Sequence, residues 1–453
     1  MQLAAVCTDP FVICCTFMCL LLHLALRSLN PNSASGRRLP PGPRGVPVLG
    51  ALPLVGPAPH SGLLALARKY GPVMYLRMGT CGVVVASSPS AARTFLKALD
   101  QRFANRPAVA SAEDMSYGCQ NMVFANYGPK WKLLRKLSSV HLLGASAVAG
   151  WASVRRDEAG RALRAVLEAA DAGRPVVVPE MLVCALANIV GQITVSKRVF
   201  DAQGDESNTY KEMIKSLLTG TGLFNISDFV PALSWLDLQG VQAKLRRIHI
   251  QFDGLVTKWL AEHAATAEDR LREGRLDFVD KLRAINDDEG GETITEVNIK
   301  GLITDMFTAG TDTSSIIVEW AMAEMIKSPS IMARAQEEMD RVIGRDRRLE
   351  ESDIANLPYL QARFLSGPAA KIDPMGNNFE LIPFGAGRRI CAGMLAGMVF
   401  VQYFLGMLVH AFEWRLPDGE DKVDMAETFG LALPKTVPLK AVVKPRLVPA
   451  AYT

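Results

Sequence analysis

Apolar residues recur at the spacing of an α-helix along most of the chain, and polar residues stand between them. The pattern is clear in LLALARKY, AARTFLKAL and IMARAQEEMDRVIG. Strand-like runs occur in VMYLRMG and CGVVVAS, and they predict a hairpin over residues 73–87. The fold class predicted from the pattern is therefore mainly α with a small β-sheet.

The longest predicted helix begins at Thr293, where Glu296 three residues later completes a capping-box pattern. It ends at Lys327, just before Ser328 and Pro329, because the residue ahead of a proline disfavours helical geometry. Between residues 196 and 277, glycines and a proline interrupt the helical pattern. We expect this stretch to be an adaptable segment that covers the domain and not part of its rigid scaffold.

The middle of the longest helix contains AGTDTSS, residues 309–315, in which small residues precede an acid and several hydroxyl side chains. Such residues lower helix propensity, so they favour a role other than helix stability. Gly310 opens room for a ligand beside the small Ala309, and Asp312 with Thr313 could carry protons and water to bound oxygen. The alternative is that the hydroxyls bond back to the helix and that Asp312 is solvated.

The N-terminal stretch FVICCTFMCLLLHLALRSL, from Phe11, carries no charge before Arg27 and approaches the length of a bilayer span. Arginines follow it and nothing basic precedes it, which predicts that the bulk of the chain is cytosolic. A cleavable signal peptide is the alternative, but its basic leading region is missing. We expect a membrane anchor over residues 1–28, a stiff proline-rich hinge over 29–50 and one large domain over 51–453.

Composition narrows the choice of partners and compartment. The net charge of +4 is spread thinly over 453 residues, and no Lys/Arg stripe alternates with aromatic residues. We therefore expect no nucleic-acid partner. The first twenty residues hold four of the eight cysteines, Cys7, Cys14, Cys15 and Cys19, and the others are far apart. This distribution is not a disulfide framework and fits a reducing compartment.

The most specific motif is PFGAGRRICAG, residues 383–393, which sets one cysteine among glycines and two arginines ahead of a long apolar helix. Cys391 has no CxxC partner, so a zinc site or a redox dithiol has little support. Phe384 offers an apolar wall, and three glycines let the backbone approach a ligand closely: Gly385, Gly387 and Gly393.

The place of Cys391 near a helix start predicts a thiol of low pKa, because unpaired N–H groups and the helix dipole stabilise a thiolate. A thiolate beside glycines and a cation suits an axial ligand of haem iron, with Arg389 available to an acidic propionate. The alternative is a buried structural cysteine next to a Gly-rich turn.

A third motif is WKLLRK, residues 131–136, in a predicted helix. Trp131 and Arg135 are four residues apart and share one helix face, which suits contact with a propionate. Lys132 and Lys136 share the neighbouring face and could meet an acidic partner. The alternative is an ordinary charged amphipathic helix.

Taken together, these residues resemble the cytochrome P-450 family of haem-thiolate monooxygenases, in which the same motifs occur in this order. Closer similarity is to plant flavonoid B-ring hydroxylases, and it is carried by NMVFANYGPKWKLLRKLSSVHLLG, FNISDFVPALSWLDLQG, MFTAGTDTSS and FELIPFGAGRRICAG. Within that group FGLAL, residues 429–433, is more similar to the 3',5'-hydroxylases than to the 3'-hydroxylases. The resemblance implies the cytochrome P-450 fold.

The resemblance also implies a reaction, in which the B-ring of a flavanone or dihydroflavonol gains a hydroxyl group from O2. It implies haem b with Cys391 as the iron ligand, and Asp312 and Thr313 as the residues that deliver protons. The haem-binding residues that it implies are Trp131, Arg135, Ala309, Gly310, Phe384, Gly387, Arg389 and Gly393.

The sequence holds no Gly-rich phosphate-binding fingerprint for a nicotinamide or flavin domain. Electrons are therefore expected from a separate NADPH-cytochrome reductase, which would dock near Lys132, Lys136 and Arg388. The implied location is the endoplasmic reticulum membrane, with a single N-terminal anchor and the catalytic domain in the cytosol.

One departure from the family concerns the stretch before the cysteine loop. Family members carry there a helix with Glu-x-x-Arg, several sheet strands and a meander, whereas here LPYLQA, ending at Ala362, runs straight into RFLSG from Arg363. We expect an internal segment to be missing between residues 362 and 363, and the fold to be incomplete. Glu338 and Arg341 match Glu-x-x-Arg by letters alone. One alternative to a 3',5'-hydroxylase is a flavonoid 3'-hydroxylase. Because a segment is expected to be missing, the other alternative is a non-catalytic truncated haem or membrane protein.

Overall fold

The computed structural model describes residues 17–18, 39–200, 213, 224–285, 292–365 and 375–452. The chain divides into two compact units, the first made of Met1–Phe103 with Phe224–Val241 and the second of Ala104–Leu223 with Gln242–Thr453. The stretch predicted as one domain, residues 51–453, thus contributes to both units. The predicted anchor lies outside the described residues except for Phe17 and Met18, which are helical and exposed.

The first unit contains the predicted hairpin. Strands β1 (Val73–Met78) and β2 (Cys81–Ala86) pair antiparallel, with Met74 opposite Val85. Met74 and Leu76 of β1 are buried with Ala51 and Ala67 in a small core, and partly buried side chains of β2 pack against it. The α-helices described in residues 39–103 of this unit are α3 (Leu52–Val55), α4 (Pro59–Tyr70) and α5 (Pro89–Arg93).

The proline-rich hinge is partly built into this unit. The backbone N–H of Tyr75 in β1 donates to the carbonyl of Pro41 at 2.9 Å, and the N–H of Gly79 donates to Leu49 at 3.0 Å. A Cβ atom on Gly42 would lie 1.8 Å from the carbonyl oxygen of Tyr75, so only glycine fits there. The end of the hinge therefore lies along β1.

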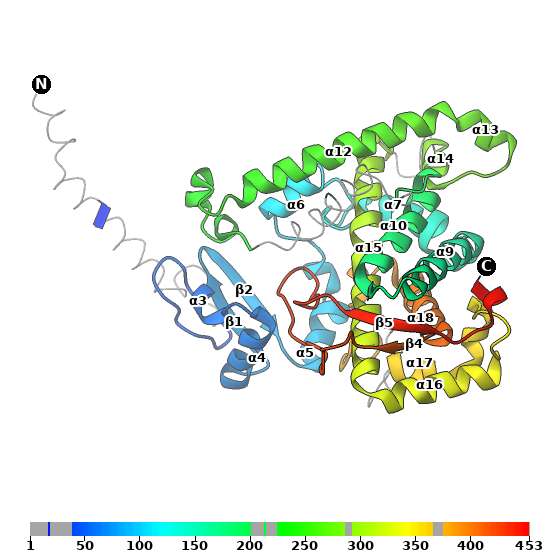
Figure 1. The fold of residues 1–453 in the computed structure, drawn as a ribbon. Helices are drawn as coiled ribbons and strands as arrows, with labels where there is room; N and C mark the ends of the chain where they lie inside the picture. Colours follow the sequence, from blue (N-terminus) through cyan, green and yellow to red (C-terminus); the bar gives the residue numbers. More distant parts are fainter. Residues whose placement is uncertain are drawn as a thin grey trace, which may run out of the picture. The chain divides into compact units, whose positions relative to one another are not determined.

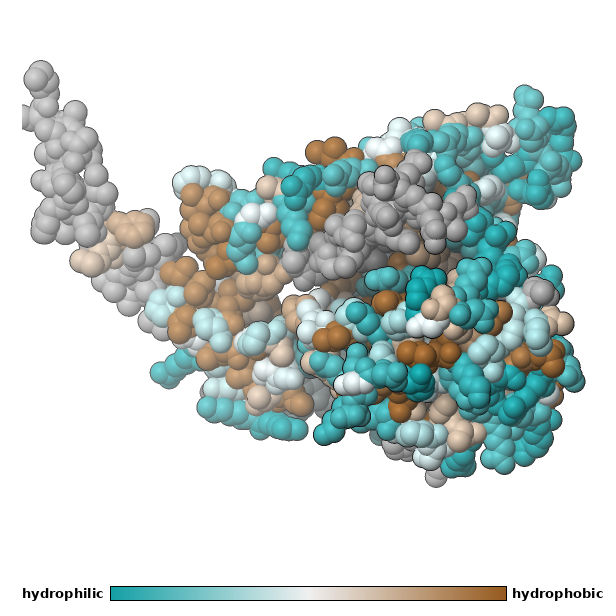
Figure 2. All heavy atoms as spheres, viewed as in Figure 1, coloured by the Kyte–Doolittle hydropathy of each residue, from teal (hydrophilic) through white to brown (hydrophobic). Residues whose placement is uncertain are grey.

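Several large apolar side chains of the first unit are exposed, and Figure 2 shows brown, apolar surface over this part of the molecule. Trp235 is 80% exposed. The others include Leu54, Leu64, Val84, Leu236 and Leu238. Contiguous apolar surface of this kind marks sites of contact with other molecules or with membranes.

The second unit is mainly helical, as predicted (Figure 1). Its small antiparallel sheet has the order β3 (Val176–Val177), β5 (Lys440–Pro445) and β4 (Phe412–Arg415). Its α-helices are α6 (Ala110–Met115), α7 (Pro129–Ser138), α8 (Ala145–Gly150), α9 (Ala152–Asp171), α10 (Val178–Val195), α12 (Val241–Ala265), α13 (Ala267–Arg272), α14 (Phe278–Arg283), α15 (Glu296–Lys327), α16 (Pro329–Val342), α17 (Pro358–Leu365) and α18 (Met394–Ala411).

Helix α15 is the long central helix. It ends at Lys327 as predicted, but its capping box is formed by Thr295 and Asn298 instead of Thr293 and Glu296. The Asn298 amide also donates to the carbonyl of Gln120 at 3.0 Å, so a tertiary contact favours this register of the cap.

Two further helices, α10 and α18, pack against α15. Within the described residues, both are long and apolar enough to cross a membrane. However, 67% of the residues of the α10 span and 56% of those of α18 are buried inside the protein. Their apolar composition is therefore accounted for by the core of the second unit.

Glu338 on α16 serves a local structural purpose. Its carboxylate accepts hydrogen bonds from the backbone N–H groups of Tyr359 at 2.8 Å and Leu360 at 3.1 Å, at the start of α17. This contact satisfies N–H groups that have no partner within α17 itself. Helix α17 then continues past Ala362 and Arg363, the point where the sequence predicts a missing segment.

Candidate active site

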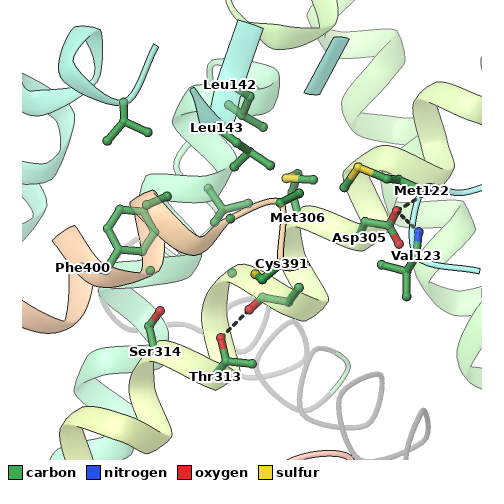
Figure 3. A pocket seen from close by; sticks show the side chains of 18 of the residues that line it. Met122, Val123, Leu142, Leu143, Asp305, Met306, Thr313, Ser314, Cys391 and Phe400 are labelled. Atoms are coloured by element: carbon green, nitrogen blue, oxygen red, sulfur yellow. Dashed lines mark hydrogen bonds between the residues drawn. The ribbon is translucent and has the colours of Figure 1, made fainter. Parts of the chain in front are cut away.

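A cavity of about 240 Å³ lies within the second unit, between α7, α10, α15, α18 and the cysteine loop (Figure 3). Its lining is mostly apolar, and Cys391 and Thr313 face the same space. The sequence-predicted residues that line it are Trp131, Arg135, Ala309, Gly310, Thr313, Phe384, Arg389, Cys391 and Gly393. Two predicted residues, Asp312 and Gly387, are not among its lining residues.

The cysteine loop is a tight turn that depends on glycine. Gly385 and Gly387 have φ angles of +71° and +69°, a region that side chains with a Cβ atom rarely adopt. The N–H of Cys391 donates to the carbonyl of Phe384 at 2.9 Å and closes the turn. Helix α18 begins at Met394, so the loop holds the sulfur at the entrance of a buried helix. Gly387 therefore shapes the loop and does not line the cavity.

The thiol of Cys391 does not have the low pKa that its place near a helix start predicts. Burial raises the pKa of Cys391, although the N–H of Gly393 and the charge of Arg135 act to lower it. The accessible surface of the side chain faces the cavity, whose walls are largely apolar. Loss of solvation therefore outweighs the helix terminus, and the thiolate requires a positive partner such as a metal ion.

Cationic side chains gather at one end of the cavity, namely Arg106, Arg135 and Arg389. Burial and the charges of the other two arginines lower the pKa of Arg389 to about 10. The Arg389 guanidinium lies over the ring of Trp131, 4.7 Å from its centroid. Because the three cations repel one another, an anionic group bound at this end would be stabilised.

The AGTDTSS stretch of α15 combines features of its two interpretations, a role beside bound oxygen and hydroxyls that bond back to the helix. The Thr313 hydroxyl donates to the carbonyl of Ala309 at 2.7 Å, which is the back-bonding alternative. Asp312 is half-buried, and burial raises its pKa, so it is less solvated than that alternative expects. A Cβ atom on Gly310 would lie 3.3 Å from Val190, so this glycine keeps α10 and α15 close together.

Asp305 is a lining residue that the sequence reasoning did not identify. Its carboxylate is buried and accepts from the side chain of Asn121 at 2.5 Å and from the N–H groups of Met122 at 2.8 Å and Val123 at 3.2 Å. Burial raises its pKa to about 7, against the effect of these donors. A helical spacing of four would have placed Asp305 on one face with Ala309 and Thr313.

The cytochrome P-450 family model matches residues 40–364 and 362–440 of this chain. The chain belongs to the cytochrome P-450 family. The family consists of monooxygenases that use haem iron and O2 and receive electrons from a redox partner. This cytochrome P-450 therefore has the fold class predicted from its sequence.

Curated relatives cover most of the chain. A flavonoid 3',5'-hydroxylase of Eustoma exaltatum subsp. russellianum is 50% identical over 470 residues, covering 90% of this chain and 92% of the relative. A flavonoid 3',5'-hydroxylase of Solanum melongena is 46% identical, covering 95% of this chain and 96% of the relative. A flavonoid 3'-monooxygenase of Arabidopsis thaliana is 39% identical, with 96% of each chain covered.

The matches also locate a difference in length. The alignment to the Eustoma protein extends over 470 residues, more than the 453 of this cytochrome P-450, so part of it is a gap in this chain. The two segments matched by the family model meet at residues 362–364.

The residues of the cavity fit a haem. Cys391 is the one thiol among the lining residues, apolar side chains cover most of the rest, and guanidinium groups also line the cavity. This arrangement matches an iron porphyrin, which is a flat apolar group with a soft-ligand preference at iron and two carboxylates on one edge. A Cβ atom on Gly393 would meet nothing within 4 Å, so the loop leaves open space beside the sulfur.

Two cations of the predicted partner patch of this cytochrome P-450 meet at one aromatic ring. Lys132 and Arg388 lie over the same ring, with their cationic groups 5.2 Å and 5.1 Å from the centroid of Tyr127. The Arg388 guanidinium also donates to the Tyr127 hydroxyl at 2.8 Å. Two of the three predicted cations are thus close together in space, although 256 positions separate them in the sequence.

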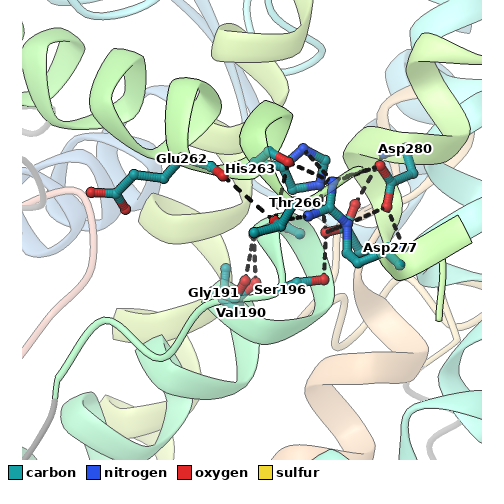
Figure 4. A network of polar contacts seen from close by, with 10 residues as sticks. Val190, Gly191, Ser196, Glu262, His263, Thr266, Asp277 and Asp280 are labelled. Carbon is teal, nitrogen blue, oxygen red and sulfur yellow. Dashed lines mark hydrogen bonds and ion pairs between the residues drawn. The ribbon is translucent and has the colours of Figure 1, made fainter. Parts of the chain in front are cut away.

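A second polar cluster lies apart from the cavity lining, and Figure 4 shows it in close view. His263, Asp277 and Asp280 lie close enough to hold a metal ion. However, Arg270 donates to His263 Nδ1 at 3.0 Å and to Asp280 at 2.8 Å. Since arginine only donates, His263 Nδ1 accepts and its Nε2 donates to Asp277 at 2.8 Å. The guanidinium therefore supplies the positive charge, and the cluster ties α12 to α14.

Proposed function

We propose that this protein is a flavonoid 3',5'-hydroxylase, which hydroxylates the B-ring of two kinds of flavonoid, the flavanones and the dihydroflavonols. The cavity in which Cys391, Thr313 and the arginines converge carries the proposal. Relatives named flavonoid 3',5'-hydroxylase support the substrate class. The mostly apolar lining suits a flat aromatic molecule.

The proposed cofactor is haem b, which supplies the activation of O2 when it is bound. Cys391 would hold its iron, and Arg135 and Arg389 would face its carboxylates. Phe384, Ala309, Gly310 and Gly393 would border the ring. Trp131 supports this end through its ring, because its indole N–H already donates to the carbonyl of Met122 at 3.1 Å.

Proton delivery is proposed for α15. The Thr313 hydroxyl faces the cavity and can accept one hydrogen bond while it donates to Ala309. Asp312 adjoins it in sequence but does not line the cavity, and its raised pKa lets the carboxyl group keep a proton closer to neutral pH. Asp312 would therefore act as a proton source through Thr313 or water.

The proposed electron donor is an NADPH-cytochrome reductase that docks near Lys132, Lys136 and Arg388. Cationic groups on this surface would attract an acidic partner and raise its rate of encounter. We also propose that residues 1–28 anchor the protein in the endoplasmic reticulum membrane, with the catalytic domain over residues 51–453 in the cytosol. The apolar stretch followed by arginines supports this orientation.

The meeting of the two family matches at residues 362–364 supports a second candidate function. In this alternative, the chain lacks an internal segment between residues 362 and 363 and is a non-catalytic haem or membrane protein. The lost helix would have packed beside the cysteine loop, and the lost strands would have paired with the hairpin over residues 73–87. Native domains are stable by only about 5–15 kcal/mol, so the loss of several core elements can exceed the whole margin.

The two candidates differ in turnover. The chain as written and a form with a relative's segment inserted between Ala362 and Arg363 are each incubated with flavanone or dihydroflavonol, NADPH and the reductase. Hydroxylated product from the chain as written supports the enzyme. Product and stoichiometric haem from the repaired form alone support the truncated protein, and no flavonoid product from either form contradicts the proposed substrate class.

A further inference from the structure

The short segment Asn121–Val123 forms part of the cavity wall, because Met122 and Val123 both line it. Its N–H side faces α15, where Asp305 accepts from the side chain of Asn121 and from the N–H groups of Met122 and Val123. Figure 3 shows Asp305 beside these two residues. One buried carboxylate thus satisfies three donors of a segment that has no regular secondary structure.

The opposite, carbonyl side of the same segment is held from the cationic end of the cavity. Trp131 Nε1 donates to the carbonyl of Met122 at 3.1 Å. Arg389 donates to the carbonyl of Val123 at 3.5 Å and, two residues beyond the segment, to that of Ala125 at 2.6 Å. The wall is therefore fixed on both sides by residues of the site. Asp305 is the only carboxylate among these fixing groups. A neutral asparagine of the same size would offer one acceptor oxygen where the carboxylate offers two, and its NH2 group cannot accept from the three donors.

Close packing reinforces this contact. A Cβ atom on Gly301, one turn before Asp305, would lie 3.1 Å from the Cβ of Asn121. The backbone of the segment at Asn121 therefore lies directly against α15. Without the carboxylate, the N–H groups of Met122 and Val123 would be buried without partners.

We propose that Asp305 is a positioning residue that sets the cavity wall formed by Met122 and Val123 and thereby the orientation of the substrate. The proposal rests on the proposed function for the identity of the substrate, a flavonoid. Asp305 acts through the segment and does not itself touch the reacting atoms. Its position two helical turns before Thr313 places this wall on the same α15 face as the proposed proton path.

The chain offers a matched control in Asp253 on α12. Asp253 accepts from the Tyr117 hydroxyl at 2.9 Å and from Lys300 at 2.9 Å, so it also ties the stretch before Asn121 to the helices. It does not line the cavity. Loss of Asp253 should loosen the stretch near Tyr117 and leave Met122 and Val123 in place.

The first experiment measures amide hydrogen exchange on the full chain as written, without any added ligand. In Asp305→Ala, the amides of Met122 and Val123 should exchange about tenfold faster or more, because each loses its acceptor. In Asp253→Ala they should keep their protection. Unchanged exchange in Asp305→Ala, or equal acceleration in both variants, would overturn the proposal.

The second experiment uses haem-loaded protein and the milder variant Asp305→Asn. In this variant an NH2 group replaces one carboxylate oxygen and faces N–H donors that it cannot accept from. We expect KM for the flavonoid to rise about tenfold. The ratio of singly to doubly hydroxylated product should also change, with the haem spectrum unaltered. Asp305→Glu should recover part of the loss, and Asp253→Asn should leave KM unchanged.

The two experiments separate the two proposals. If the unaltered chain turns over no flavonoid while Asp305→Ala accelerates exchange as expected, the substrate assignment fails and the positioning role of Asp305 stands. If flavonoid is turned over and Asp305→Asn leaves both KM and product ratio unchanged, the positioning role fails and the substrate assignment stands.

Discussion

Cys391 shows how the surroundings of one residue decide its chemistry. Its loop is fixed by glycines and by the hydrogen bond from its own N–H to Phe384, yet burial raises the pKa of its thiol. A metal ion reverses this effect, because binding favours the deprotonated form. The residue is therefore suited to ligation and poorly suited to act as a free nucleophile.

Replacement of Cys391 by alanine tests the proposed ligation. Any haem bound by the unaltered protein should give the red-shifted reduced-CO band of thiolate ligation, and Cys391→Ala should abolish that band. Cys184→Ala is the control, because Cys184 lies on α10 and does not line the cavity. An unchanged band in Cys391→Ala would assign the ligand to another residue.

Replacement of Thr313 by alanine tests the proposed proton path, in the form with the inserted segment. Haem content should stay the same, while more of the electrons from NADPH end in peroxide and fewer in product, because the hydroxyl manages protons and does not hold iron. Thr308→Ala on the same helix is the control, since Thr308 does not line the cavity. Full coupling of electrons to product in Thr313→Ala would refute the role.

At the scale of elements, α15 and the cysteine loop show which site residues could be predicted from the sequence. The cysteine loop and AGTDTSS were identifiable because their glycines, acid and hydroxyls interrupt patterns that otherwise favour a regular core. Asp305 was not, because its partner Asn121 is 184 positions away and nothing local marks either residue. The cap of α15 was two residues off, because Thr293 and Glu296 fit the usual capping-box pattern, whereas the observed pair Thr295 and Asn298 has Asn where the pattern has Glu or Gln. A contact from Asn298 to Gln120 favours the observed pair.

The polar cluster that ties α12 to α14 should make the stability of the protein depend on pH. Burial acts to raise the pKa of Asp280, but the hydrogen bond from Arg270 lowers it below its ordinary value of 3.8. Because the folded pKa is the lower one, the stability from Asp280 is present above about pH 4 and is lost as pH falls through the folded pKa. Asp280→Asn should lower the free energy of unfolding by about 3 kcal/mol at pH 7.

Urea unfolding at several pH values measures this effect. The stability difference between the unaltered protein and Asp280→Asn should shrink as the pH falls from 5 to 3, by the sign argued above. Asp269→Asn serves as control, because Asp269 pairs with Arg272 on the exposed surface and should matter little. A difference between the two proteins that stays constant from pH 7 to pH 3 would contradict the ion-pair account.

At the scale of the whole molecule, the sequence predicted the mainly helical class, the hairpin and the central helix, since each follows from local periodicity. It did not predict the division into two units, because residues 224–241 join the first unit from far along the chain. Thr80, for example, donates through its N–H to the carbonyl of Phe229 at 2.8 Å. Such a pairing depends on tertiary packing, which no local pattern records.

Truncation before Pro40 tests the membrane anchor. We expect the truncated protein to leave the membrane fraction only in part, since Trp235 and its exposed apolar neighbours on the first unit remain. Sedimentation with vesicles of neutral phospholipid measures the retained fraction. The double change, truncation with Trp235→Ser, should reduce retention further, and equal retention with and without residues 1–39 would show that the anchor contributes nothing.

The hinge has a consequence for how such truncations should be made. Strand β1 pairs with β2 on one side, and its other side would be an open edge onto which a second chain could add a strand. The hinge covers part of that edge, and its prolines lack the N–H groups that a further strand would need. A protein cut just before Pro40 keeps this cover. One cut at residue 51 loses it and is expected to aggregate edge to edge, so we expect the proline-rich stretch to protect the solubility of the protein.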